Sequence, residues 1–169
     1  MTQPSVPDDV ARMCRLAEEY LADAQLLSTA SNRQSHADYL LQITAFEILL
    51  KALRITHGLP PKRNHSYSDL FDDLPEPVKL QVRTLASERL GPSVDYSRLS
   101  DFLKAYTYNF GALRYSYEPY EGQTDEQVHK SGTQWLEAGA KVEEADFAFY
   151  PEELFGLTEA LLSLLGRSA

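Results

Sequence analysis

The most restrictive feature of this 169-residue chain is a helix-length segment, residues 35–57, that is apolar around most of its circumference. Its large apolar residues do not keep to one helical face: Leu40, Leu41, Ile43, Phe46, Ile48, Leu49, Leu50 and Leu53. Gly58 and the Pro60-Pro61 pair end the segment. Because such a helix needs apolar neighbours on most sides, we expect it to lie at the centre of a bundle or to pack against a second copy of the chain.

Further segments with helical periodicity accompany this central one. They cover residues 7–27, 65–71, 77–90, about 100–113 and 151–165. We therefore predict an all-α fold, with a single domain over residues 1–169 built as an up-and-down bundle of four to six helices. Before the last of these segments the periodicity weakens, and the alternation around Trp135 and Phe147 permits a small β-hairpin near residues 133–149.

The chain is acidic, and its charge is unevenly distributed. Lys and Arg number 16, Asp and Glu number 25, and the net charge is −9. A broad phosphate-binding surface needs an excess of cations, so any nucleic-acid site must be local. Ten acidic residues and two lysines lie between Glu118 and Glu153, a pattern typical of a solvated face or of a docking site for a basic partner. A short run of basic residues forms either the solvated end of a helix, which is the simpler interpretation, or a basic edge if the fold brings the side chains together: Lys51, Arg54, His57, Lys62, Arg63 and His65.

Several classes of protein are disfavoured by the sequence. Cys14 is the single cysteine, so no internal disulfide can form, and the four histidines lack the paired spacing of a zinc site. Glycine-rich phosphate loops and nucleophile elbows are absent. No apolar run approaches the roughly 18 residues that span a bilayer, and no signal-peptide pattern is present. We expect a cytoplasmic protein with no membrane segment, no metal and no cofactor.

A few polar side chains stand out against this helical pattern. Thr44, Glu47, Lys51 and Arg54 share one face of the central segment, where they form either an ion pair exposed to water or part of a site. Arg114 and Glu118 are one turn apart if the helix continues, so they either form an intrahelical ion pair, which is the simpler interpretation, or leave the Arg114 guanidinium to bind a phosphate. Six of the ten tyrosines lie in the range 96–120; they are either packing residues or the lining of a pocket for a base.

The order of these residues resembles the HEPN (higher eukaryote and prokaryote nucleotide-binding) family. Residues 45–53 hold Glu47 and Lys51 four positions apart, and His65 follows after a Gly/Pro loop. A later run, residues 110–118, is similar to a Phe, Arg-Tyr and Glu signature of one bacterial branch of that family. The resemblance covers roughly residues 10–120.

This resemblance implies a four- to five-helix up-and-down bundle, frequent homodimerisation and, in many members, metal-independent RNA cleavage. In such ribonucleases an arginine, four to six residues and then a histidine meet their dimer mates. The histidine assists proton transfer while the arginine stabilises phosphate charge. That spacing is missing here, because Arg54 and His57 are too close and Arg114 is followed by tyrosines and Glu118.

Three functional hypotheses follow. The first is a noncatalytic HEPN-like binding or regulatory module, a homodimer, for a nucleotide, RNA or protein partner. Its ligand-binding residues would be Glu47, Lys51, His65, Arg114, Tyr115, Tyr117 and Glu118. The second is a divergent metal-independent ribonuclease of toxin or defence type, with His65 as the acid or base and Arg114 on the phosphate. The third is an interaction protein whose acidic segment docks on a nucleotidyltransferase-like partner.

Overall fold

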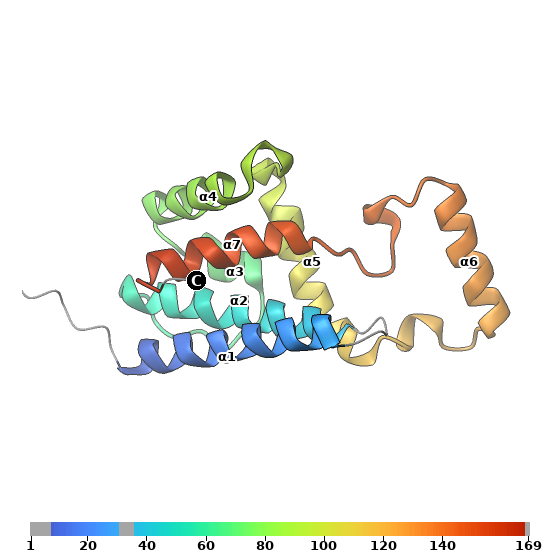
Figure 1. The fold of residues 1–169 in the computed structure, drawn as a ribbon, viewed down its shortest axis with the longest axis horizontal. Helices are drawn as coiled ribbons and strands as arrows, with labels where there is room; N and C mark the ends of the chain where they lie inside the picture. The colour runs from blue at the N-terminus through green and yellow to red at the C-terminus, as the bar shows by residue number, and fades with distance from the viewer. Residues whose placement is uncertain (1–7, 31–35, 168–169) are drawn as a thin grey trace, which may run out of the picture.

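The computed structural model of the protein, which describes residues 8–30 and 36–167, has an all-α fold (Figure 1). The helices in this part of the chain are α1 (Asp8–Ala30), α2 (Ala37–Thr56), α3 (Tyr67–Asp72), α4 (Glu76–Leu90), α5 (Leu99–Ala112), α6 (Asp125–Glu137) and α7 (Pro151–Leu164). Single 3-10 turns lie between them at Gly91–Ser93, Tyr96–Arg98, Leu113–Tyr115, Glu118–Tyr120 and Val142–Glu144. The predicted all-α helical bundle is confirmed. The helix starts predicted at residues 7 and 35 fall outside the described residues.

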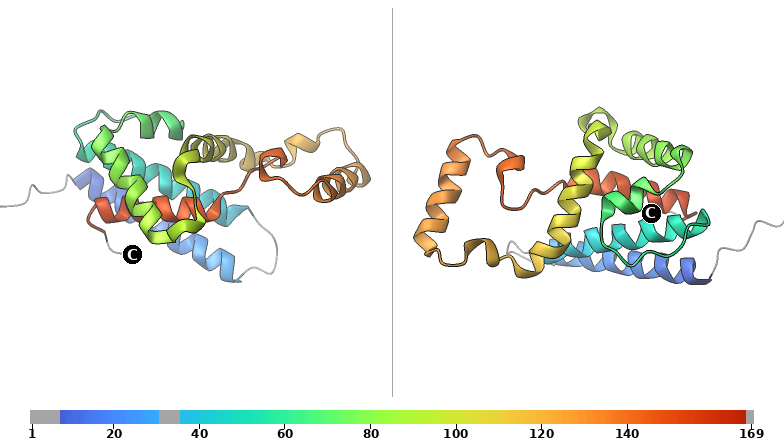
Figure 2. Two further views of the ribbon diagram at one scale, coloured as in Figure 1. Left: turned by 90° about the horizontal axis from the view of Figure 1, so that it is seen from above. Right: turned by 180° about the vertical axis from the view of Figure 1, so that it is seen from behind.

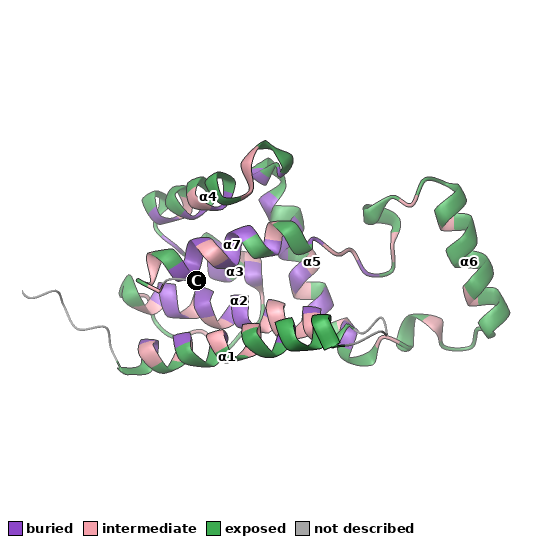
Figure 3. Cartoon of the chain, viewed as in Figure 1, coloured by how far each residue is buried: buried purple, intermediate pink, exposed green. Residues whose placement is uncertain are grey.

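Helix α2 occupies the centre of the bundle. Helices α1 and α7 lie beside it, and α3 and α5 also contact it (Figure 1). Ten of its 20 residues are buried, and Figure 3 shows this burial concentrated where α2, α7 and α5 meet. Its apolar circumference is therefore satisfied within one chain. Although α2 is mostly apolar, neither it nor any other helix in the described ranges could span a lipid bilayer.

Helix α7 joins the centre of the bundle to its outer helix, α4. Pro151 opens α7 with Glu152 and Glu153 in its first turn, where acidic side chains favour the positive end of the helix dipole. Gly156 then allows α7 to approach its neighbours closely. A Cβ atom at this position would lie 2.7 Å from Cδ1 of Leu90 and would also overlap the hydroxyl of Tyr96.

The β-hairpin predicted near residues 133–149 is wrong. Residues 133–137 are the end of α6, and no strand occurs within 8–30 or 36–167. A capping box starts this helix: the backbone N–H of Thr124 donates to Oε1 of Gln127 at 2.8 Å, and the Gln127 N–H donates to Oγ1 of Thr124 at 3.3 Å. Such a box satisfies two backbone donors of the first turn, a local signal that outweighs the short alternation around Trp135.

The chain leaves the bundle after α5, forms an arm that carries α6, and returns to start α7. Both views in Figure 2 show α6 standing apart from the other helices. Buried polar side chains fix the point of return: Asn109 Nδ2 donates to the Ala148 carbonyl at 2.8 Å, and the Tyr106 hydroxyl donates to the Tyr150 carbonyl at 3.1 Å. These bonds explain why Tyr106, one of the clustered tyrosines, is a packing residue with no exposed surface.

The close approach at Gly156 can be tested with a paired glycine substitution. Gly156→Ala should lower the free energy of unfolding by about 1–3 kcal/mol, since overlap with Leu90 and Tyr96 outweighs the gain in helix propensity. Gly111→Ala is the matched control, because a Cβ at this helical position of α5 meets nothing within 4 Å. It should raise stability by up to about 1 kcal/mol. Urea unfolding of both variants measures the difference, and equal effects would contradict the packing described.

Candidate functional site

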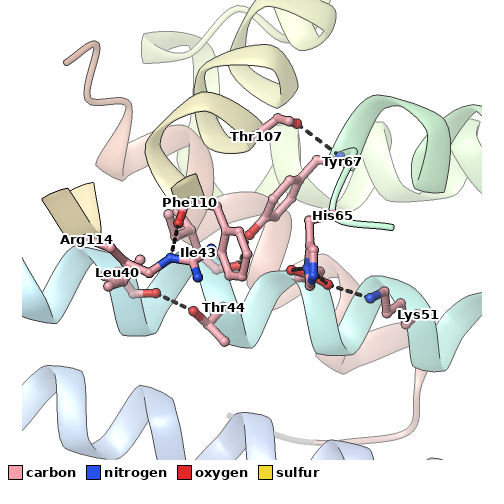
Figure 4. Close-up of polar contacts among 10 residues, drawn as sticks. Leu40, Ile43, Thr44, Lys51, His65, Tyr67, Thr107, Phe110 and Arg114 are labelled. Carbon is pink, nitrogen blue, oxygen red and sulfur yellow. Dashed lines mark hydrogen bonds and ion pairs between the residues drawn. The ribbon is translucent and has the colours of Figure 1, made fainter. Parts of the chain in front are cut away.

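The candidate site is built around Glu47, a carboxylate in the middle of α2. Its side chain is only 6% exposed. Nζ of Lys51, one turn later, lies 2.5 Å from Oε1 of Glu47. Nδ1 of His65 lies 2.9 Å from Oε1 and 3.1 Å from Oε2 (Figure 4). The Glu47–Lys51 ion pair therefore exists, but Glu47 is buried beneath the loop before α3, whereas one of the two interpretations of the sequence had the pair exposed to water.

The loop that carries His65 is held by the next polar residue of the α2 face. Arg54 is buried, and its guanidinium forms an ion pair with Asp73 and donates to the Pro60 carbonyl at 3.1 Å. Lys62 also pairs with Asp73. Hydrogen bonds from Lys62 and then from Arg54 lower the pKa of the Asp73 carboxyl below its usual value. Arg54 thus fixes the middle of the loop, whereas the sequence placed it on a basic edge.

Tyr67 anchors the other side of His65. Its backbone N–H donates to Oγ1 of Thr107 at 3.1 Å, and its buried hydroxyl donates to the Ile43 carbonyl at 2.8 Å. Burial raises the pKa of this phenol far above its usual value, so the hydroxyl keeps its proton and remains a donor. These two bonds tie the start of α3 to both α5 and α2, and they set the position of His65 against Glu47.

Phe110 brings Arg114 to the same place. The imidazole of His65 stacks on the Phe110 ring with centroids 4.7 Å apart. The guanidinium carbon of Arg114 lies 4.5 Å from the centroid of that ring, and Nε donates to the Phe110 carbonyl at 2.9 Å. In Figure 4 the ring lies between the two side chains. His65 and Arg114, which are 49 positions apart in the sequence, therefore flank one aromatic ring.

Arg114 also borders a hollow on the surface. The hollow measures about 440 Å³, and His36, Leu40, Leu113 and Ser116 line it as well. His36 is stacked on Phe149 with ring centroids 5.3 Å apart, so its ring is held in place. The guanidinium of Arg114 therefore has the hollow on one side and the Phe110 ring on another, so it has both polar and apolar neighbours.

The orientation of His65 decides what it can do chemically. An ionised carboxylate only accepts hydrogen bonds, so the proton of a neutral His65 resides on Nδ1, the nitrogen that faces Glu47. Nε2 then has an available lone pair and makes no hydrogen bond within the described part of the chain. The side chain is 57% exposed. This imidazole can accept a proton from a ligand or, once protonated, donate one.

Three of the predicted site residues lie away from this cluster. Tyr115 and Tyr117 are exposed and contact each other edge to face, with ring centroids 6.5 Å apart. The predicted ion pair between Arg114 and Glu118 is wrong: α5 ends at Ala112, the chain continues in short 3-10 turns, and the two side chains form no ion pair in the structure. Residues four positions apart face each other only when the α-helix continues through both of them.

The sequence interpretation missed two parts of the site. Phe110 entered the sequence interpretation as part of the signature in residues 110–118 but was given no role in the site, although it precedes Arg114 by four residues and that spacing allows contact on a helix. Asp73 was not singled out, because nothing local marks it as the partner of Arg54, 19 positions earlier. Within the described residues, no group of three or more potential metal ligands forms a metal site.

Comparison of the chain with protein-family models, with curated proteins and with solved structures finds no match.

The support that Asp73 gives to the loop should depend on pH. A carboxyl whose pKa is lowered by folding contributes stability above its unfolded pKa of about 3.9, and this contribution is lost as the pH falls through the folded value. Asp73→Asn should lower the free energy of unfolding at pH 7 by about 3 kcal/mol, since it leaves the buried Arg54 without its counter-ion. The difference from wild type should shrink below about pH 4.

Urea unfolding at neutral and acidic pH measures this effect. Asp23→Asn is the control, because Asp23 is exposed on α1 and has no ion pair among the described residues. It should change stability by less than about 0.5 kcal/mol at either pH. A deficit in Asp73→Asn that stayed the same across the pH range would contradict a role for the Asp73 charge.

Proposed function

We propose that the protein is a HEPN-like helical module that binds a phosphate-bearing ligand, a nucleotide or RNA, at the site where Arg114 and His65 flank the Phe110 ring. The observation that carries this proposal is a guanidinium fixed in place, without a carboxylate partner among the described residues, beside an exposed imidazole. A side chain in that state is ready to receive an anion.

Arg114 has the properties of an anion-binding residue. Its Nε and the Phe110 ring hold the guanidinium plane, and its terminal nitrogens make no hydrogen bond with any described residue. A guanidinium presents its donors in a planar fork that matches two phosphate oxygens. Because its rotamer is already restricted, less conformational entropy is lost when an anion binds.

The size of the basic region limits the ligand. Lys51 is neutralised by Glu47, and both Arg54 and Lys62 are paired with Asp73. Arg114 therefore remains as the cation of the site that has no carboxylate partner among the described residues, which suits one phosphate group rather than a long nucleic-acid track. Phe110 and the hollow lined by His36 and Leu40 provide the apolar contacts that a base requires.

The family resemblance agrees with this location. Glu47, Lys51, His65 and Arg114 are the residues that carry the resemblance, and they come from separate segments that contact one another around Phe110. Because the usual arginine-to-histidine spacing is missing, these residues favour a member of the family that binds its ligand without cleaving it.

Titration with labelled single-stranded RNA and with nucleotides tests the proposal. Arg114→Ala should weaken binding roughly 10- to 100-fold, the cost of losing a charge-assisted hydrogen-bonded pair. It should also reduce the slope of log K against log salt by about 1. Arg114→Lys should recover only part of the loss, because lysine keeps the charge but not the planar fork.

Arg83→Ala is the matched control for these titrations. Arg83 is also exposed, also lies over a phenylalanine ring, that of Phe71 at 5.8 Å, and also has no carboxylate partner in the described ranges. Its removal should leave binding unchanged. Equal losses in the two variants, or no binding by the wild type, would contradict the assignment of Arg114.

A second candidate function, metal-independent RNA cleavage, is favoured by the orientation of His65. With Nδ1 held by Glu47, Nε2 could remove the proton of a ribose 2′-hydroxyl, whose oxygen then attacks phosphorus. The bond to the 5′-oxygen breaks, that oxygen takes up a proton, and a 2′,3′-cyclic phosphate forms. Arg114 would stabilise the charge that develops on the phosphate.

Incubation of labelled RNA in EDTA separates cleavage from binding. If the protein is a ribonuclease, it releases fragments that end in a cyclic phosphate, and His65→Gln lowers the rate about 100-fold or more. Glu47→Gln should have a smaller effect because this residue only orients the ring. If His65→Gln cleaves RNA as fast as the wild type, His65 is not the acid or base. If the wild type binds RNA without cleaving it, the protein is a binding module and not a ribonuclease.

A further inference from the structure

We propose that the acidic arm, residues 118–146, is a docking surface for a basic amphipathic segment of a partner protein. This interaction is independent of the phosphate site. It rests on three properties of the arm: a helix without a fully buried residue, an apolar strip that is partly exposed to solvent, and a concentration of carboxylates without ion pairs.

Helix α6 gains almost no stability from the rest of the protein. None of its 13 residues is buried, and it lies apart from the bundle in Figures 1 and 2. An isolated helix of this length is marginal in water even with good sequence propensity, and Gly132 in its interior lowers that propensity further. The capping box at Thr124 supports one end only. A partner that packs along α6 would supply the missing contacts.

The apolar residues of the arm form a strip suited to such packing. Val128 and Trp135, seven positions apart, share one helical face, and Leu136 lies beside it. Leu136 is 63% exposed, and Val142 in the following turn is 38% exposed. The indole N–H of Trp135 donates to the Lys141 carbonyl at 2.9 Å, which fixes the ring and brings the two ends of the strip together.

The charge of the arm selects the partner. The arm holds eight acidic residues and two lysines, a net charge of −6 out of −9 for the whole chain. Six of these carboxylates have no ion-pair partner among the described residues: Glu118, Glu121, Asp125, Glu126, Glu137 and Asp146. Nucleic acid and a second arm would both be repelled. A segment with apolar residues on one face and Lys or Arg on its flanks is complementary to both features of the strip.

Two contacts hold the base of the arm, one to the bundle and one between the two ends of the arm, so the strip has a defined position. Arg98, next to the start of α5, pairs with Glu143 at 2.8 Å. The Tyr120 hydroxyl donates to Asp146 at 2.8 Å and links the outgoing and returning parts of the arm. A partner therefore meets the strip at a defined place beside the bundle, and its contacts along α6 add the stability that the helix lacks by itself.

Trp135 is the single tryptophan of the chain, so the intrinsic tryptophan fluorescence of these 169 residues reports on this surface. The probe is a synthetic helical peptide of leucine and lysine, compared with the same peptide carrying glutamate for lysine. The lysine peptide should shift Trp135 emission to shorter wavelength in a saturable way that weakens with salt. The glutamate peptide should not.

Substitutions on the arm identify the contact. Leu136→Gln should weaken binding of the lysine peptide about tenfold, and Glu126→Gln or Glu137→Gln about two- to fivefold each. Leu80→Gln is the matched control, because Leu80 is 64% exposed on α4, outside the arm, and binding should not change. The proposal is overturned if the lysine peptide does not bind or if both peptides give the same response. It is also overturned if the emission shifts when only the protein concentration is raised, because the strip would then be covered by a second copy of the chain.

Discussion

The buried carboxylate of Glu47 is the constraint on which the arrangement of the site depends. A charge placed inside an apolar helix bundle is costly unless partners surround it. Lys51 satisfies it from the same helix, but His65 must come from the following loop, so the loop has to cross the middle of α2. Arg54, one turn beyond Lys51, poses the same requirement and is met by Asp73 and Pro60. The polar stripe of α2 thus determines where the loop lies, and stability and site geometry depend on the same contacts.

Much of the fold could be predicted from the sequence because its signals are local. The helix ends at Gly58, Gly91 and Gly166 follow from residues that adopt a left-handed backbone there. The segment between α5 and α7 could not be predicted in this way. Its capping box and its alternating residues gave conflicting local signals, and the segment has little tertiary packing to reinforce either one. Where burial is slight, a few hydrogen bonds at a helix start decide the structure.

The site was harder to predict than the fold, and the reason is also physical. Glu47 and Lys51 are neighbours on one helix, so their pairing follows from spacing. The placement of His65 and Arg114 on the same Phe110 ring depends on how α3, α5 and the loop pack, which no short-range pattern records. Glu118 was placed beside Arg114 on the assumption that α5 continues, whereas the helix ends at Ala112. Long-range pairs such as Arg54 and Asp73 are set by the topology of the whole chain.

The distribution of charge separates the two surfaces proposed for this protein. At the phosphate site the acidic groups are used to hold cations in place, which leaves Arg114 without a carboxylate partner among the described residues. On the arm the reverse holds, since most carboxylates lack a cation. An anionic ligand is repelled by the arm and attracted at Arg114, and the opposite applies to a basic protein segment. Because the Debye length is about 8 Å at physiological ionic strength, two such surfaces on one small domain can act on different partners without cancelling each other.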